Sequence, residues 1–235
     1  MAAPMSYVPV AQRDEATRGD FMVKVYQHLV LAIVAFAAIE AVLLATGIAE
    51  GIFNYLQGAS MAWLLILGGF MIVSWLATNA AHDVMNTQRQ YAGLFGLAAA
   101  YSLLFAPVLY WFFSGGDGGT STVVAAIAIT VAAFAGLSVV GYTTRKDLSF
   151  MRPLIMWGGV VALLLIVVAV LFGTELGVWF SLGMIALAGA SILYQTQTIL
   201  RRYPEEAYVG ASVQLFASVM LLFWYVLRLL GQVRG

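Results

Sequence analysis

Residues 153–200 read PLIMWGGVVALLLIVVAVLFGTELGVWFSLGMIALAGASILYQTQTIL, and Glu175 is the one charged residue among them. Glu175 divides the stretch into two charge-free runs, 153–174 and 176–200. A helix that crosses a bilayer needs about 20 consecutive apolar residues. Each run is long enough to cross once and too short to cross twice comfortably. We therefore expect two membrane-spanning helices joined near Glu175.

The same pattern continues on both sides of this pair. Further charge-free runs cover residues 51–82, 90–116, 118–144 and 207–227. Residues 25–49 form one more run, in which Glu40 is the one charged residue. These runs lack the alternation of apolar and polar residues that marks the strands of a membrane barrel. The sequence therefore predicts an all-α integral membrane protein with seven transmembrane helices. The predicted spans are residues 25–47, 60–80, 91–113, 122–142, 154–173, 178–199 and 209–230.

The composition excludes several classes of protein. Hydrophobic residues make up 63% of the 235-residue chain and charged residues 9%, whereas an ordinary soluble domain has about 25% charged residues. So few polar residues could not cover the surface of a soluble enzyme, and so apolar a chain is not disordered. Eleven Lys and Arg balance eleven Asp and Glu, so no basic surface predicts binding to nucleic acid. The chain has no Cys, which excludes disulfides and Cys-ligated metals.

The basic residues lie on alternate connecting segments. Cytoplasmic loops of membrane proteins carry an excess of Lys and Arg. The asymmetry therefore predicts a cytoplasmic N-terminus and, after seven crossings, a C-terminus on the other side. Six spans with one re-entrant segment are the alternative. Nine of the eleven basic residues lie on the N-terminal side: Arg13, Arg18, Lys24, Arg89, Arg145, Lys146, Arg152, Arg201 and Arg202.

The chain is predicted to have one domain. Residues 1–20 are polar and contain Pro4 and Pro9, and we expect them to form a mobile cytoplasmic tail. No linker divides the remainder, so residues 21–235 are predicted to form a single seven-helix transmembrane domain. Several pairs of glycines within the spans are expected to let helix backbones approach closely. The pairs are Gly68 and Gly69, Gly93 and Gly96, Gly158 and Gly159, and Gly183 and Gly189.

Glu40 is the clearest candidate for a functional residue. It lies within the first predicted span, about 10 Å from the outer end, where a charged side chain is costly. We expect it to face the interior of the bundle and to contact Arg228 in the last span. Such a pair either fixes the packing of the helices or takes part in a pore or gate, and the sequence leaves both open.

Gln195 and Gln214 are the next candidates. They lie at similar depths in the sixth and seventh spans, so we expect their amides to meet. Hydrogen bonds between transmembrane helices contribute on the order of 0.6 to 2 kcal/mol each, and amides do not titrate. The pair therefore either holds the two helices together or lines a pore.

The remaining polar residues indicate neither a metal site nor an enzyme. His28 and His82 are far apart in the sequence, which makes a poor metal site, and we expect them to form hydrogen bonds at the membrane interface. The chain contains no P-loop, no H-E-x-x-H and no G-x-S-x-G motif. We therefore expect no catalytic activity, no metal and no cofactor.

Three segments resemble a known family of membrane proteins. Residues 141–152 read GYTTRKDLSFMR, which resembles a signature of the Bax inhibitor-1 family, also called the transmembrane Bax inhibitor motif or YccA/YetJ-like family. ILYQT at 192–196 and LLFWYVLRLL at 221–230 resemble two further segments of that family. The resemblance covers residues 20–231. The signature residues are Tyr142, Thr143, Thr144, Arg145, Lys146 and Asp147.

The resemblance implies a fold and an activity. The fold is a seven-helix bundle in which the last helix is central and the other six form two groups of three. The implied activity is a proton-sensitive calcium leak, which depends on one carboxylate from the sixth span and one from the last. Some members of the family act on a membrane-bound AAA protease and protect against stress.

The sequence departs from the family at the carboxylate pair. Gln195 occupies the aspartate position of the sixth span, and SVQLF at 212–216 contains no acid. Because Ca²⁺ favours charged oxygen ligands, neither the calcium ligands nor the pH sensor carries over. We expect a leak channel for calcium or another cation that lacks this sensor. The alternative is a regulator of a membrane protease or of a stress response that does not conduct ions. Since no retention signal is present, a bacterial inner membrane is the expected location.

Overall fold

The computed structural model describes residues 8–58, 62–116, 118–144 and 146–234. These residues form helices and no strand, and seven of the helices are long and apolar enough to cross a membrane. The predicted seven-helix membrane protein is therefore confirmed. The spanning helices are α1 (Glu15–Ala45), α3 (Ala62–Ala81), α4 (Thr87–Phe113), α5 (Gly119–Thr143), α6 (Met151–Phe172), α7 (Val178–Arg202) and α8 (Tyr208–Arg234).

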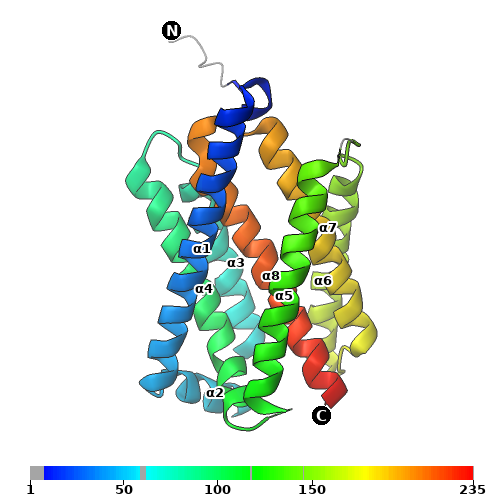
Figure 1. Ribbon diagram of the computed structural model, residues 1–235. Coiled ribbons are helices and arrows are strands. Elements are labelled where there is room, and N and C mark those ends of the chain that lie inside the picture. Colours follow the sequence, from blue (N-terminus) through cyan, green and yellow to red (C-terminus); the bar gives the residue numbers. More distant parts are fainter. Residues whose placement is uncertain (1–7, 59–61, 117, 145, 235) are drawn as a thin grey trace.

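The two ends of the chain lie at opposite ends of the bundle (Figure 1), as an odd number of crossings requires. We call these the N-terminal end and the C-terminal end of the bundle. The loops that join α3 to α4, α5 to α6 and α7 to α8 lie at the N-terminal end with the start of α1. Most of the basic residues are therefore at this end.

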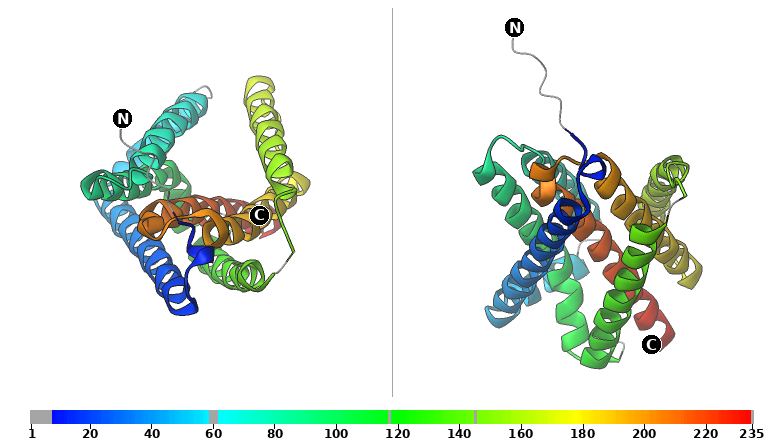
Figure 2. Two further views of the ribbon diagram at one scale, coloured as in Figure 1. Left: turned by 90° about the horizontal axis from the view of Figure 1, so that it is seen from above. Right: turned by 45° about the horizontal axis from the view of Figure 1, so that its top comes forward.

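α8 is the central helix. It packs against α1, α3, α4, α5 and α7, and most of its residues are buried, whereas few residues of α3 and α6 are. Around it, α1, α3 and α4 form one group of three helices, and α5, α6 and α7 form the other (Figure 2). The expected arrangement of a central last helix between two groups of three is confirmed.

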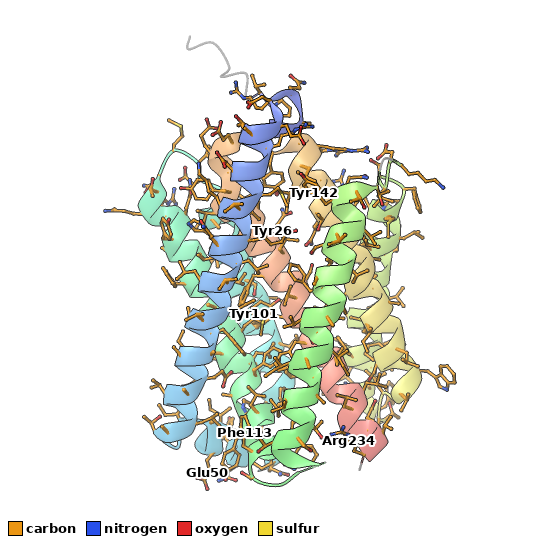
Figure 3. All side chains as sticks on the ribbon, in the orientation of Figure 1. Tyr26, Glu50, Tyr101, Phe113, Tyr142 and Arg234 are labelled. Carbon is orange, nitrogen blue, oxygen red and sulfur yellow. The ribbon has the colours of Figure 1, made fainter. Side chains whose placement is uncertain are left out.

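A short helix that the sequence analysis did not predict precedes α3. This helix, α2 (Ile48–Gly58), has 11 residues and is too short to cross a membrane. It lies across the C-terminal end of the bundle, with Glu50 at its outer side (Figure 3). Ala49 and Leu56 are buried, so one side of the helix packs against the bundle. The charge-free run 51–82 predicted one helix because no charge separates α2 from α3.

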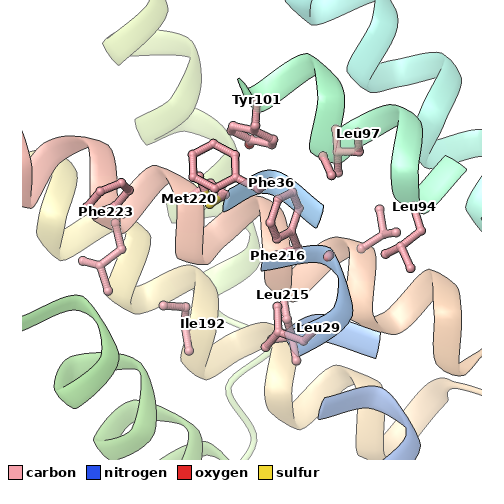
Figure 4. Close-up of a cluster of buried hydrophobic side chains, with 14 of the residues drawn as sticks. Leu29, Phe36, Leu94, Leu97, Tyr101, Ile192, Leu215, Phe216, Met220 and Phe223 are labelled. Carbon is pink, nitrogen blue, oxygen red and sulfur yellow. The ribbon is translucent and has the colours of Figure 1, made fainter. Parts of the chain in front are cut away.

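The core is a continuous cluster of apolar side chains around α8. Phe216 of α8 lies against Tyr101 of α4, and Phe223 stacks on Phe105 of α4, with ring centroids 5.4 Å apart in both pairs. Figure 4 shows Leu29 and Phe36 of α1 entering the same cluster. The middle of the bundle is therefore packed with aromatic and aliphatic side chains.

The N-terminal segment differs from the expected mobile tail over residues 8–20. A 3-10 turn, η1 (Val10–Gln12), precedes α1, and Val10 is fully buried. The amide of Val10 donates to the carbonyl oxygen of Tyr203 at 2.9 Å, and Asp14 caps the start of α1 by accepting from Thr17. The apolar Val10 and this helix cap explain the difference. Residues 1–7 lie outside the described residues.

The expected role of the glycine pairs in helix packing holds for some of them. A Cβ on Gly93 would collide with the backbone of α3 at Ala77, and a Cβ on Gly158 would lie 2.7 Å from Leu187 of α7. Gly189 faces Leu137 of α5. An added Cβ would meet no atom within 4 Å at the other glycines, which are Gly68, Gly69, Gly96, Gly159 and Gly183.

Candidate functional site

Gln195 and Ser218 form a buried polar contact between α7 and α8. The hydroxyl of Ser218 donates to Oε1 of Gln195 at 2.9 Å, and Ser218 is buried. The expected Gln195–Gln214 contact is wrong, because Gln214 lies four residues, or about one helical turn, before the position on α8 that faces Gln195. Neither an amide nor a hydroxyl of this kind titrates near neutral pH. The contact therefore holds α7 and α8 together without a charge.

Gln214 contacts His82 at the end of α3. Nδ1 of His82 lies 2.7 Å from the carbonyl oxygen of Thr78, and Nε2 lies 3.2 Å from the hydroxyl of Tyr203 and 3.3 Å from Nε2 of Gln214. A carbonyl only accepts, so Nδ1 carries the hydrogen and Nε2 of the neutral ring accepts. The hydroxyl of Tyr203 is protonated at neutral pH, as for any tyrosine, and burial raises its pKa further, to about 12. These bonds connect α3 and the α7–α8 turn to α8.

His28 forms a matching contact on the other side of the N-terminal end. Its Nδ1 lies 2.7 Å from the carbonyl oxygen of Lys24, and its Nε2 lies 2.8 Å from the hydroxyl of Tyr91 on α4. The ring also lies against Tyr208 of α8, with centroids 4.9 Å apart. The hydrogen-bonding role expected for both histidines is therefore confirmed.

Glu40 is the most unusual polar group in the bundle. It is only 4% exposed, and neither carboxylate oxygen has a hydrogen-bond partner among the described residues. Phe36 and Leu43, its neighbours on the same face of α1, are buried as well. An unpaired carboxylate surrounded by apolar groups is costly within a membrane.

The expected pair of Glu40 and Arg228 is not formed. Nη2 of Arg228 instead donates to the carbonyl oxygen of Leu176 at 2.8 Å. Leu176 belongs to the loop between α6 and α7, in the other group of three helices from α1. Similar depth in the membrane suggested the pair, but depth alone does not fix the direction in which each side chain leaves its helix.

The signature segment after α5 is held by a residue that the sequence analysis missed. Gln197 of α7 donates to the carbonyl oxygens of Lys146 at 2.6 Å and Thr144 at 3.3 Å, and it accepts from the amide of Leu148 at 2.8 Å. Gln197 is buried. Its place two residues after Gln195, within an apolar span, was the available signal.

Asp147 makes the remaining bonds of this segment. Its carboxylate accepts from the amide and the hydroxyl of Ser149, which hold its pKa below the ordinary value, and Arg201 lies 3.6 Å away. Any stabilisation from these bonds is present above the ordinary pKa of Asp and lost as the pH falls through the lowered value. Tyr142 is exposed at the C-terminal end of α5, which lies at the N-terminal end of the bundle (Figure 3), while Arg145 lies outside the described residues. The signature therefore shapes the α5–α6 loop.

A family model described as "Inhibitor of apoptosis-promoting Bax1" matches residues 18–235. The chain belongs to the Bax inhibitor-1 family. An uncharacterized protein of Pseudomonas aeruginosa is 33% identical over 160 residues, which is 67% of each chain. YccA of Escherichia coli, named a modulator of FtsH protease, is 26% identical over 164 residues, 69% of this chain and 70% of YccA. The resemblance to this family is thus confirmed.

Within the described residues, the Bax inhibitor-1 fold pairs none of the candidates Glu40, Gln195, Gln214 and Arg228 with one another. Gln195 of α7 contacts Ser218, Gln214 of α8 contacts His82, and Glu40 and Arg228 lie apart. A groove of about 720 Å³ between α2, α3 and α4 is lined by apolar residues such as Ile52, Phe70 and Leu103. The geometry at α7 and α8 suits helix association better than the coordination of a divalent cation.

Proposed function

We propose that this protein is a membrane-embedded regulator of a membrane-bound AAA protease and that it does not conduct ions along α8. The observation that carries the proposal is the neutral contact between Gln195 and Ser218. Ca²⁺ takes six to eight oxygen ligands and favours carboxylates, and this contact supplies no charge. Phe105, Phe216 and Phe223 fill the adjacent core. This packing supports a bundle that acts by binding a partner protein and not by conducting ions.

The relatives support the same function. YccA of Escherichia coli, which aligns with about seven tenths of this chain, is named a modulator of FtsH protease. A second YccA is named an inner membrane protein. We extend both properties to this chain and place it in a bacterial inner membrane. The basic residues at the N-terminal end of the bundle favour a cytoplasmic N-terminus by the positive-inside rule.

Reconstitution with the protease tests this function. FtsH of Escherichia coli is placed in proteoliposomes with a membrane-protein substrate, with or without an equimolar amount of this protein. We expect the rate of substrate degradation to change by about twofold or more, since even 1 kcal/mol of coupling is worth about fivefold. An unrelated seven-helix membrane protein at the same density is the control. An equal rate with this protein and with the control would refute the function.

A cation leak is the second candidate, and Glu40 is the observation that favours it. A buried carboxylate without a donor or a cation is typical of ion and proton pathways in membranes. In liposomes with a calcium-sensitive dye inside, such a leak would be reduced by Glu40→Gln. Equal flux through the wild type and Glu40→Gln, at the level of empty liposomes, would exclude it.

A further inference from the structure

One face of α8 is incompletely covered by the rest of the bundle. Five residues on this face are each partly exposed, while every residue between them is buried. Their spacing of three and four residues places them on one side of the helix. We call this the open face of α8, and it consists of Gln214, Ala217, Leu221, Trp224 and Arg228.

Both groups of three helices border the open face, and neither covers it. On one side, Gln214 contacts His82 directly after α3, and Trp224 contacts Phe105 of α4 with ring centroids 4.9 Å apart. On the other side, Leu221 and Trp224 pack against the cluster that contains Met184 of α7. In the left view of Figure 2, α3 and α6 extend away from the bundle on the same side, with α8 between them.

The open face is apolar in its middle and polar at both ends. Ala217, Leu221 and Trp224 form the middle. At one end, Arg228 uses Nη2 for the carbonyl of Leu176 and forms no ion pair within the described part of the chain. At the other end, the amide nitrogen of Gln214 makes the contact with His82. Its Oε1 accepts no hydrogen bond from a described residue. N–H groups of Arg228 and the amide oxygen of Gln214 therefore remain available to a binding partner.

We propose that the open face of α8 binds one transmembrane helix of the protease partner. That helix carries a carboxylate near Arg228 and a hydrogen-bond donor about 14 residues away near Gln214. The inference rests on the proposed function and adds where, and through which chemistry, the partner is recognised. Arg and a carboxylate form charge-assisted hydrogen bonds, and the small side chain of Ala217 lets a second backbone come close.

The length of the open face favours a helix over a lipid. Gln214 and Arg228 are 14 residues apart, which is about 21 Å along the helix axis, in a hydrocarbon core about 30 Å thick. The two polar ends therefore lie in opposite leaflets. A single phospholipid occupies one leaflet, and its polar headgroup reaches one of the two ends. A second helix has the same rise per residue and meets both.

Site-specific photocrosslinking in proteoliposomes with Escherichia coli FtsH tests the inference. A photoreactive phenylalanine derivative replaces Leu221 on the open face or, as matched controls, the lipid-exposed Leu164 of α6 or Val131 of α5, which are 59% and 61% exposed. We expect crosslinks from Leu221 to a transmembrane segment of FtsH, in a yield at least about fivefold above both controls. Equal yields at the three positions would overturn the inference.

Variants of Arg228 test the proposed chemistry. Arg228→Gln should lower the crosslinking yield from Leu221 by about fivefold or more, since a charge-assisted bond is lost, whereas Arg228→Lys should keep part of it. Arg234→Gln, at the C-terminal end of α8 and away from the open face, should change nothing. An unchanged yield in Arg228→Gln would contradict the charge pairing.

The same samples separate failure of the inference from failure of the proposed function. If degradation by FtsH responds to the protein while crosslinks arise from Leu164 or Val131 and not from Leu221, the site is wrong and the function stands. If neither crosslinks nor a change in degradation occur, both are wrong.

Discussion

Gln195 meets Ser218 rather than Gln214, and this register decides which variant rebuilds an acidic pair. In Gln195→Asp with Ser218→Asp, two carboxylates lie within reach of one shared proton, and they repel each other when both are ionised. We expect this variant to show a calcium flux into dye-loaded liposomes that changes by about threefold or more between pH 6 and 8, and the wild type to show little change.

The matched control for this prediction is Gln195→Asp with Gln214→Asp. It adds the same two charges, but the charge on α8 lies one helical turn away from Ser218, the position that faces Gln195. Its pH response should therefore be weaker. A steep pH-dependent flux in the wild type, retained after Glu40→Gln and after replacement of both histidines by Gln, would contradict the register.

Gln197 offers a second prediction at the scale of one side chain. Gln197→Ala removes three hydrogen bonds to the backbone of the α5–α6 loop, and each bond contributes about 1 kcal/mol. We expect unfolding in detergent at a temperature lower by about 5 °C or more. Gln88→Ala, at an exposed position of α4, is the control and should lie within about 1 °C of the wild type. Equal shifts in the two variants would disprove the role of Gln197.

Sequence alone could find polar residues in the spans but not their partners. Glu40, Gln195 and Arg228 were recognisable because polar groups are rare among apolar residues. Their partners depend on helix rotation to within a fraction of a turn, and in near-uniformly apolar helices no amphipathic pattern fixes that rotation. Ser218 and Gln197 were missed for the same reason.

At the scale of helices, Gly93 and Gly96 differ in what surrounds them. A Cβ on Gly93 would enter the backbone of α3, and a Cβ on Gly96 would meet nothing within 4 Å. Gly93→Ala should therefore destabilise the contact of α3 with α4 by about 1 to 3 kcal/mol. Gly96→Ala should be neutral or slightly stabilising, since Ala favours helix over Gly. The unfolding temperatures of the two variants test this, and a Gly93→Ala variant as stable as Gly96→Ala would contradict the close approach.

The spans themselves were predictable because charge and hydropathy set them directly. α1, α4 and α8 extend beyond the predicted limits, since polar residues at the membrane interface continue a helix as readily as apolar ones. α2 was missed because it shares a charge-free run with α3. The central position of α8 came from the resemblance to the family, not from composition.

At the scale of the whole molecule, the bundle has one end rich in Lys and Arg. We expect that end in the cytoplasm, so a reporter that is active only in the cytoplasm should be silent when fused after Gly235. The same reporter fused before Met1 is the control and should be active. A strong signal from the fusion after Gly235 would reverse the proposed orientation or show an even number of crossings.

The central claim is that the protein acts on a protease by contact and not by conducting ions. The most direct measurement is the degradation of a membrane substrate by FtsH in proteoliposomes that also contain a calcium-sensitive dye. The account predicts that this protein changes the degradation rate by about twofold or more, while dye fluorescence stays at the level of vesicles with FtsH alone. An unchanged degradation rate together with a calcium flux above that level would contradict it.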